Sequence, residues 1–123
     1  MDREFPPDHE LIAFFEAEPV VHHPDTPWLY NTLDFTTTRD AIKVYCRIAG
    51  ANGRLTTCLM LAGLEIAKFE LRGAQAFRLD VNKNHETLVV TFAPDQSLDK
   101  FTLQLKPSVR AALSSVFRQR PST

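Results

Sequence analysis

The sequence lacks the features that mark a membrane-spanning or secreted chain. No apolar stretch approaches the roughly 20 residues that a transmembrane helix needs. The first ten residues, MDREFPPDHE, carry acids and prolines, whereas a secretory signal has a basic start and an apolar run of about 7–15 residues. We therefore expect a cytoplasmic protein that does not insert into a membrane.

Cysteine is scarce: only Cys46 and Cys58 are present, on either side of a glycine-containing turn. Pairing the apolar faces of the two flanking strands places Cys46 inward, opposite Thr57 or Leu59, and Cys58 on the outward face. The two thiols then point to opposite sides of the sheet, and their spacing is not the CxxC of a zinc or redox site. This pattern predicts two reduced cysteines.

Glycine is also scarce, and its four positions lie in separate turns that form neither a G-x-G-x-x-G nor a Walker A phosphate loop. A G-x-S-x-G nucleophile elbow is absent too. Glu65, Glu70 and Asp80 are interleaved with basic residues, which favours cross-strand ion pairs over a catalytic pair of carboxylates. We expect no cofactor, and nothing positively indicates an enzyme.

What the chain does contain is typical of a folded domain. Its 123 residues are 44% hydrophobic and 24% charged, far from the composition of disordered chains. The net charge of −1 argues against DNA or RNA binding, but residues 1–40 carry about −7 and residues 41–123 about +6. Either the acidic segment lies over the basic body and partly neutralises it, or a basic surface awaits an anionic partner.

The spacing of apolar residues predicts one helix followed by a long antiparallel meander. A helix over residues 9–18 would be capped by Asp8 and ended by Pro19. After this helix the spacing of apolar residues changes from a period of 3.6, typical of a helix, to a period of 2, typical of a strand. The turns between the strands are too short to contain crossover helices, so neighbouring strands should be antiparallel. We expect a bulge near Ile66–Ala67. Seven strands are predicted, over residues 28–37, 41–49, 54–62, 64–72, 75–81, 86–92 and 100–106.

A second helix is predicted at the C-terminus, over residues 108–119. Ser108 can cap it, and apolar residues recur with helical spacing at Val109, Ala112, Leu113, Val116 and Phe117. The expected fold is a single α+β domain spanning residues 1–123, its meander forming a curled sheet, a sandwich or a split barrel. Over residues 28–120 this order of elements resembles a pleckstrin-homology-like domain, which implies a split barrel closed at one end by the C-terminal helix.

The segment VVHHPDTPW, residues 20–28, contains two of the four histidines and the single tryptophan. His22, His23 and Asp25 are weak candidates for a metal site, because adjacent histidines point in different directions. Asp25 is equally suited to an Asx-turn. We interpret the segment as a stiff connection, with Trp28 anchoring it against the core and beginning the first strand.

The outward face of the sheet is the stronger candidate for a binding surface. Tyrosine, arginine and methionine are enriched at the centres of protein interfaces. The expected register places five partner-binding candidates on this face: Tyr30, Lys43, Tyr45, Arg47 and Met60. The alternative is that the apolar stripe of the first helix covers part of the same face.

Three functions remain open from the sequence. The preferred hypothesis is a small, non-enzymatic domain that binds another protein. A split-barrel binder of a lipid headgroup, a peptide or a small apolar molecule is the alternative. A metal-dependent enzyme that uses His22 or His23 with Asp25 is the least supported. The identity of the partner and the oligomeric state have no signature in the sequence.

Overall fold

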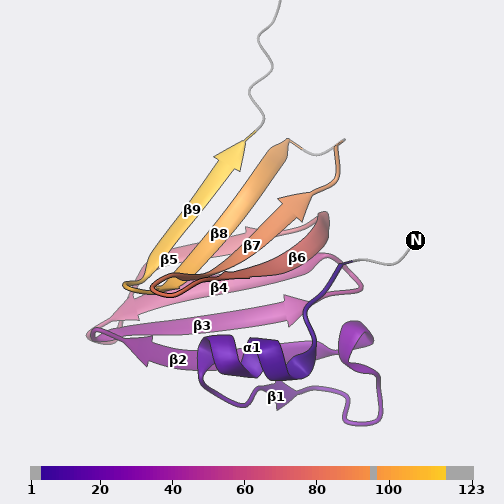
Figure 1. The fold of residues 1–123 in the computed structure, drawn as a ribbon, viewed down its shortest axis with the longest axis horizontal. Helices are drawn as coiled ribbons and strands as arrows, with labels where there is room; N and C mark the ends of the chain where they lie inside the picture. Colours follow the sequence, from indigo (N-terminus) through magenta and orange to yellow (C-terminus); the bar gives the residue numbers. More distant parts are fainter. Residues whose placement is uncertain (1–3, 95–96, 116–123) are drawn as a thin grey trace, which may run out of the picture.

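The computed structural model describes residues 4–94 and 97–115. These residues form one α-helix, a short 3₁₀ helix and nine strands (Figure 1). In chain order the elements are α1 (Asp8–Phe15), β1 (Val20–Val21), η1 (Trp28–Tyr30), β2 (Thr32–Arg39), β3 (Ile42–Ala49), β4 (Arg54–Leu61), β5 (Leu64–Leu71), β6 (Ala74–Val81), β7 (Glu86–Phe92), β8 (Leu98–Lys106) and β9 (Arg110–Ser115).

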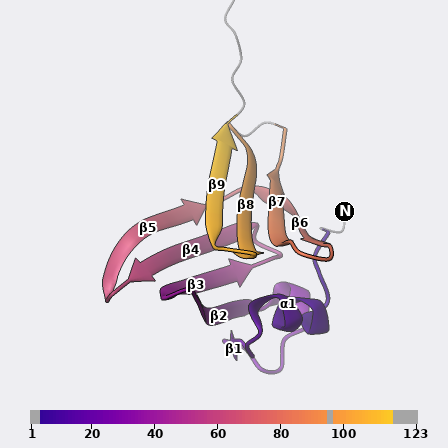
Figure 2. The same ribbon diagram turned by 60° about the vertical axis from the view of Figure 1, so that its left-hand side comes forward.

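The strands form two antiparallel sheets in which every strand pairs with its neighbour in sequence. One sheet has the order β1-β2-β3-β4-β5 and the other β6-β7-β8-β9, and Figure 2 shows the second sheet standing over the first. The chain passes between them after β5, through Gly73, whose φ of 77° suits a residue without a side chain. The predicted antiparallel pairing of sequential strands is therefore confirmed, but the predicted count of seven strands is wrong, because the described residues form nine strands in two sheets.

The inner faces of the two sheets enclose a shared core built around aromatic rings. Phe35 on β2, Phe77 on β6 and Phe101 on β8 are fully buried. Phe69 on β5 lies with its ring centroid 5.1 Å from that of Phe101, so the two sheets meet through aromatic contact. On β3, buried and more exposed residues alternate, as expected for a sheet with one face in the core and one toward solvent.

Helix α1 packs on the inner side of the first sheet and contacts β2 and β6. Phe15 stacks on Phe35 with ring centroids 4.3 Å apart, and Leu11 and Phe14 are also buried. Because Phe35 points into the core, the helix does not cover the outward face, and that sequence-based alternative is wrong. Helix α1 closes the side of the molecule between β2 and β6 (Figure 1).

The helix is also shorter than the predicted range of residues 9–18. Its N-cap is Pro7, so Asp8 is the first residue of the helix and not its cap, and the Asp8 carboxylate accepts a hydrogen bond from the His9 N–H at 2.8 Å. It ends at Phe15 because Glu16 adopts a left-handed conformation with φ 55°. Arg39 from β2 donates a hydrogen bond to the Phe14 carbonyl. This hydrogen bond from a residue distant in sequence satisfies one of the last carbonyl groups of the helix. The helix therefore ends well before Pro19, the residue that was predicted to end it.

The predicted C-terminal helix over residues 108–119 is wrong across the residues that the structure describes. Arg110–Ser115 form β9 and pair with β8, with Leu113 opposite Phe101 and Ala111 opposite Leu103. Val109, Ala111 and Leu113 recur with a period of 2, whereas Val109, Ala112 and Leu113 recur with helical spacing, so the sequence permits both structures and pairing with the edge of β8 selects the strand. Residues 116–119 of the predicted helix lie outside the described residues. The pleckstrin-homology-like resemblance implied a split barrel closed by a C-terminal helix, and it is not confirmed, because β9 takes the described part of that helix and the described sheets form no closed barrel.

Two smaller features differ in their outcome. The bulge is confirmed, because Leu59 pairs with Ala67 whereas Met60 pairs with Glu65, which leaves Ile66 as the additional residue. The predicted start of the first long strand at residue 28 is wrong, since Trp28 lies in η1 and β2 begins at Thr32.

Among the described helices, neither has the length and the apolar composition that crossing a membrane requires.

Candidate functional site

The outward face of the sheet formed by β1–β5, called the outer face below, presents three rows of side chains across β2, β3 and β4. The strand register sets these rows, because residues paired across neighbouring strands share a face. The rows are Asp34, Arg47 and Thr56; Thr36, Tyr45 and Cys58; and Thr38, Lys43 and Met60.

Asp34 is the centre of a polar network on this face. Arg47 donates two hydrogen bonds to its carboxylate, from Nε to Oδ1 at 2.7 Å and from Nη2 to Oδ2 at 2.9 Å. His22 Nε2 lies 2.8 Å from Asp34 Oδ2. His22 directly follows β1, and the pairing of β1 with β2 sets its position. The His22 N–H continues this pairing by donating a hydrogen bond to the Thr32 carbonyl. Three elements therefore converge on one carboxylate.

The electrostatics of the network favour its charged forms. Partial burial opposes ionisation of Asp34, but the hydrogen bonds from Arg47 and His22 lower its pKa to about 2. The same hydrogen bond from Arg47 to Asp34 raises the pKa of Arg47. Partial burial and the nearby Asp34 carboxylate raise the pKa of Tyr45 above its usual value. Around neutral pH the outer face therefore carries an ionised Asp34–Arg47 pair beside a neutral tyrosine.

Two hollows open on either side of Arg47, and both are lined by Arg47 and Thr56. One, of about 360 Å³, extends toward His22, Asn52 and Arg54. The other, of about 350 Å³, extends along β4 and β5 and is lined by Tyr45, Cys58, Glu65, Lys68 and Glu70. Both are open to solvent, so they suit side chains inserted from a partner surface better than an enclosed small molecule.

Charge on the outer face is partly compensated and partly free. Lys68 pairs with Glu70 at 3.2 Å along the same strand, and Cys58 donates a hydrogen bond to Glu65 at 3.2 Å. Among the described residues, Lys43 and Arg54 have no ion-pair partner within 4.0 Å. The predicted neutralisation of the basic body by the acidic segment therefore occurs at particular contacts, such as that of Glu16 with Lys106 at 3.0 Å, and leaves free cations on this face.

The structure brings together four of the five predicted partner-binding residues. Lys43, Tyr45 and Arg47 follow one another along β3, and Met60 lies opposite Lys43 on β4. Tyr30 is separate: it belongs to η1 rather than to β2, and it is 65% exposed. The alternation of β3 and β4 was sufficient to place the first four on one face, whereas the 3₁₀ turn before β2 places Tyr30 apart from them.

The weak metal candidates do not converge. His22 is engaged with Asp34, and the His22 and His23 rings lie 6.4 Å apart at an angle of 60°. Asp25 is exposed and makes no hydrogen bond in the part of the chain that the structure describes. Across the same residues no group of three or more histidine, cysteine, aspartate or glutamate side chains is placed to hold a metal ion.

The loop that contains these residues is fastened by Asn31, which the sequence reasoning missed. Its side-chain amide donates to the carbonyls of His23 and Thr26, at 2.6 and 3.0 Å, and its Oδ1 accepts from the His23 N–H at 3.0 Å. Asn31 is 3% exposed. Trp28 adds a hydrogen bond to the Pro6 carbonyl and packs on the core, as predicted for an anchor. An asparagine directly before a strand was the only available signal.

Comparison with known proteins adds a likeness of fold. No protein-family model matches the chain, and no curated protein matches its sequence. The structure is similar to a chain in the contact-dependent growth inhibition toxin–immunity protein complex from Klebsiella pneumoniae 342. The TM-score is 0.77, the sequence identity is 20%, and the match covers 93% of this chain and 97% of that chain.

Proposed function

We propose that this protein is a non-enzymatic, immunity-type protein that binds a toxin through the outer face and thereby blocks it. The observation that carries the proposal is the shared fold, which extends over nearly the whole of both chains and comes from a toxin–immunity protein complex. A shared fold does not by itself specify a function. The properties of the outer face supply the second part of the argument.

The outer face has the chemistry of a protein interface. Tyr45 and Arg47 belong to the residue types that most often dominate binding energy, and Lys43 and Met60 extend the same surface along β3 and β4. Asp34 holds the Arg47 guanidinium through two hydrogen bonds. A side chain oriented before binding loses less conformational entropy when the complex forms. The hollows beside Arg47 can receive side chains of the toxin.

The role of immunity protein is preferred over that of toxin for a chemical reason. A toxin that acts as an enzyme needs titratable groups converging on a substrate pocket. On the outer face, Asp34 is tied to Arg47 and His22 in a saturated network instead. A binding protein needs surface complementarity alone. We also expect the protein to act in the cytoplasm, as predicted from the sequence.

The two other hypotheses have less support. A ligand held between the sheets would compete with Phe35, Phe77 and Phe101, which pack in the core. A metal-dependent enzyme would need His22 or His23 to converge with Asp25, and these residues point to different partners or to solvent.

Growth protection provides the test. Contact-dependent growth inhibition toxin domains, including that of the Klebsiella pneumoniae 342 complex, would be expressed in bacterial cells with and without this protein. We expect it to restore growth against a cognate toxin and to form a complex with that toxin in size-exclusion chromatography. Arg47→Glu should abolish both effects. Arg110→Glu, at an exposed site on the other sheet, should preserve them.

Two results would contradict the proposal. One is a panel in which no toxin is neutralised or bound. The other is protection that survives Arg47→Glu and Tyr45→Ala together, which would place the contact away from the outer face.

A further inference from the structure

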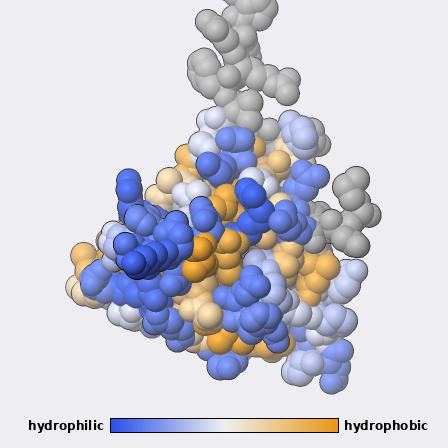
Figure 3. Space-filling model, viewed as in Figure 1, coloured by the Kyte–Doolittle hydropathy of each residue, from blue (hydrophilic) through white to orange (hydrophobic). Residues whose placement is uncertain are grey.

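A second surface, opposite in character to the outer face, lies between α1 and β6. Two adjoining hollows, of about 350 and 290 Å³, share Glu10 and Leu79 in their linings. Ala13 and Phe14 contribute from the helix, and Val81, 58% exposed, contributes from β6. Figure 3 shows apolar surface between the helix and this strand, with hydrophilic residues around it. We call the two hollows together the α1–β6 groove.

The strand that borders the groove is a sheet edge that is only partly occupied. Glu4 forms a parallel bridge with Ala76, and its carbonyl accepts a hydrogen bond from the Phe77 N–H at 2.9 Å. The N-terminal segment therefore already pairs with the first part of this edge. The pairing stops there because Pro6 and Pro7 have no N–H to donate, and the chain then turns into α1.

Beyond Phe77, none of the described residues pairs with this edge. Since the Phe77 N–H points away from β7, the alternation of an antiparallel pair directs the backbone groups of Leu79 and Val81 to the same side. The Asn82 N–H, which bonds across the hairpin to the His85 carbonyl, agrees with this alternation. The edge thus offers unpaired donors and acceptors next to an apolar groove, which is the arrangement used for binding by strand addition.

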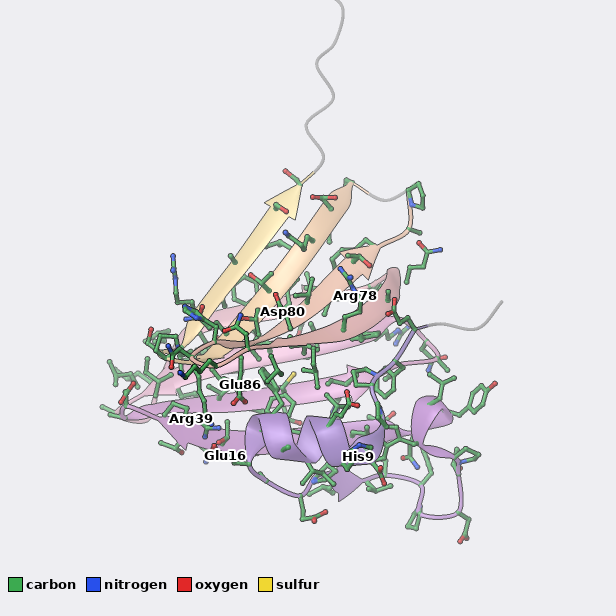
Figure 4. All side chains as sticks on the ribbon, viewed as in Figure 1. His9, Glu16, Arg39, Arg78, Asp80 and Glu86 are labelled. Carbon is green, nitrogen blue, oxygen red and sulfur yellow. The ribbon has the colours of Figure 1, made fainter. Side chains whose placement is uncertain are left out.

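Charge around the groove indicates what kind of strand would fit. Glu4 and Glu10 line one hollow and Glu86 lines the other, with Arg78 as the single basic lining residue. In Figure 4, Glu86 lies on the groove side, between β6 and α1, whereas Asp80 lies on the opposite face of β6, and Glu16 and Arg39 close one end. Lys106 bridges Glu16 at 3.0 Å and Glu86 at 3.1 Å, so it offsets part of their charge, and the excess of negative charge comes from Glu4, Glu10 and Asp80. The surroundings are therefore acidic and suit a basic segment.

We propose that the α1–β6 groove binds an extended, basic segment of a partner protein, which adds to the free edge of β6 as a further strand. Alternate apolar side chains of that segment lie on Ala13, Leu79 and Val81, and its basic side chains reach Glu10 and Asp80. This surface is on a different sheet from the outer face. The inference does not rest on the proposed toxin binding.

The test uses the whole protein, labelled with ¹⁵N, and a short synthetic peptide that alternates lysine with valine. Amide hydrogen exchange is followed by NMR with and without the peptide. At saturation we expect exchange at Leu79 and Val81 to slow by about tenfold or more, because the added strand protects their N–H groups. A matched peptide with glutamate in place of lysine should leave the exchange unchanged.

Three variants assign the effect to the groove. Val81→Pro removes an N–H that points away from β7, so it should block strand addition while leaving the sheet folded. Glu10→Lys should weaken binding of the lysine peptide at least about tenfold. Glu18→Lys carries the same charge change outside the groove and should bind like the parent protein. Circular dichroism would verify that each variant is folded.

Several outcomes would overturn the inference. Unchanged exchange at Leu79 and Val81 with the lysine peptide is one. Protection that appears at β9, the opposite edge of this sheet, instead of β6 is another. Equal binding of the lysine and glutamate peptides would remove the argument from charge.

Discussion

Arg47 and Asp34 face each other across β3 and β2 and are joined by two hydrogen bonds, at 2.7 and 2.9 Å. Both residues lie on the outer face, but they differ in exposure: the Arg47 side chain is 47% exposed and that of Asp34 only 13%. The carboxylate is therefore the fixed support and the guanidinium the accessible group. This relationship leads to the first two predictions.

Arg47→Ala should weaken binding of the partner by at least about tenfold, the range expected for a central arginine of an interface. Isothermal titration calorimetry with the purified partner would measure the change in Kd. Arg110→Ala on β9 is the matched control and should leave the Kd unchanged. An unaltered affinity in Arg47→Ala would move the interface elsewhere.

Asp34→Asn should remove a pH-dependent part of the stability. The pKa of Asp34 is about 2 in the folded protein and 3.8 in the reference state, so its ionised form stabilises the fold by up to about 2 kcal/mol. This contribution is complete above about pH 5 and is lost as the pH falls through about 2. Urea unfolding of both proteins across this range should show the difference shrinking toward low pH. A difference that stays constant with pH would contradict the assignment.

Phe15→Ala should lower the free energy of unfolding by about 3–5 kcal/mol, because it removes a fully buried ring stacked on Phe35 and leaves a cavity. Denaturant titration followed by circular dichroism would measure the loss. The exposed neighbour Glu18, changed to alanine, should alter the stability by less than about 0.5 kcal/mol. If Phe15→Ala were equally mild, α1 would not close the core as described.

The two cysteines should differ sharply in reactivity. Cys46 is fully buried and its pKa is raised to about 12 by burial, whereas Cys58 is partly exposed. Iodoacetamide should therefore modify Cys58 in the folded protein and Cys46 only after unfolding. Partial burial and the contact with Glu65 also raise the pKa of Cys58, so its modification should become faster as the pH rises above neutral.

Peptide mapping by mass spectrometry would assign the modified residue. Cys58→Ser should abolish labelling of the folded protein. Equal labelling of both thiols, or an intramolecular disulfide after mild oxidation, would contradict the register that places them on opposite faces.

Much of the candidate site could be predicted because it follows from local alternation. The period of 2 along β3 and β4 places Lys43, Tyr45, Arg47 and Met60 on one face, and the paired register confirms that arrangement. The contact of His22 with the Asp34 carboxylate could not be predicted from the sequence. It depends on the pairing of the two-residue strand β1 with β2, and a strand that short has no periodicity to read.

The sequence by itself determined the antiparallel strands β2–β8, the turns between them, the bulge at Ile66 and the opposite facing of the two thiols, because each depends on neighbours in the chain. Only the tertiary structure decided the rest. The pattern of residues 109–113 permits either a helix or a strand, and the exposed edge of β8 selects the strand. The apolar stripe of α1 could have covered either face of the sheet, and the stacking of Phe15 on Phe35 directs it to the inner face. The outer face and the free part of the β6 edge therefore stay accessible. Burial of those rings in a shared core outweighs the local preferences of a short helix.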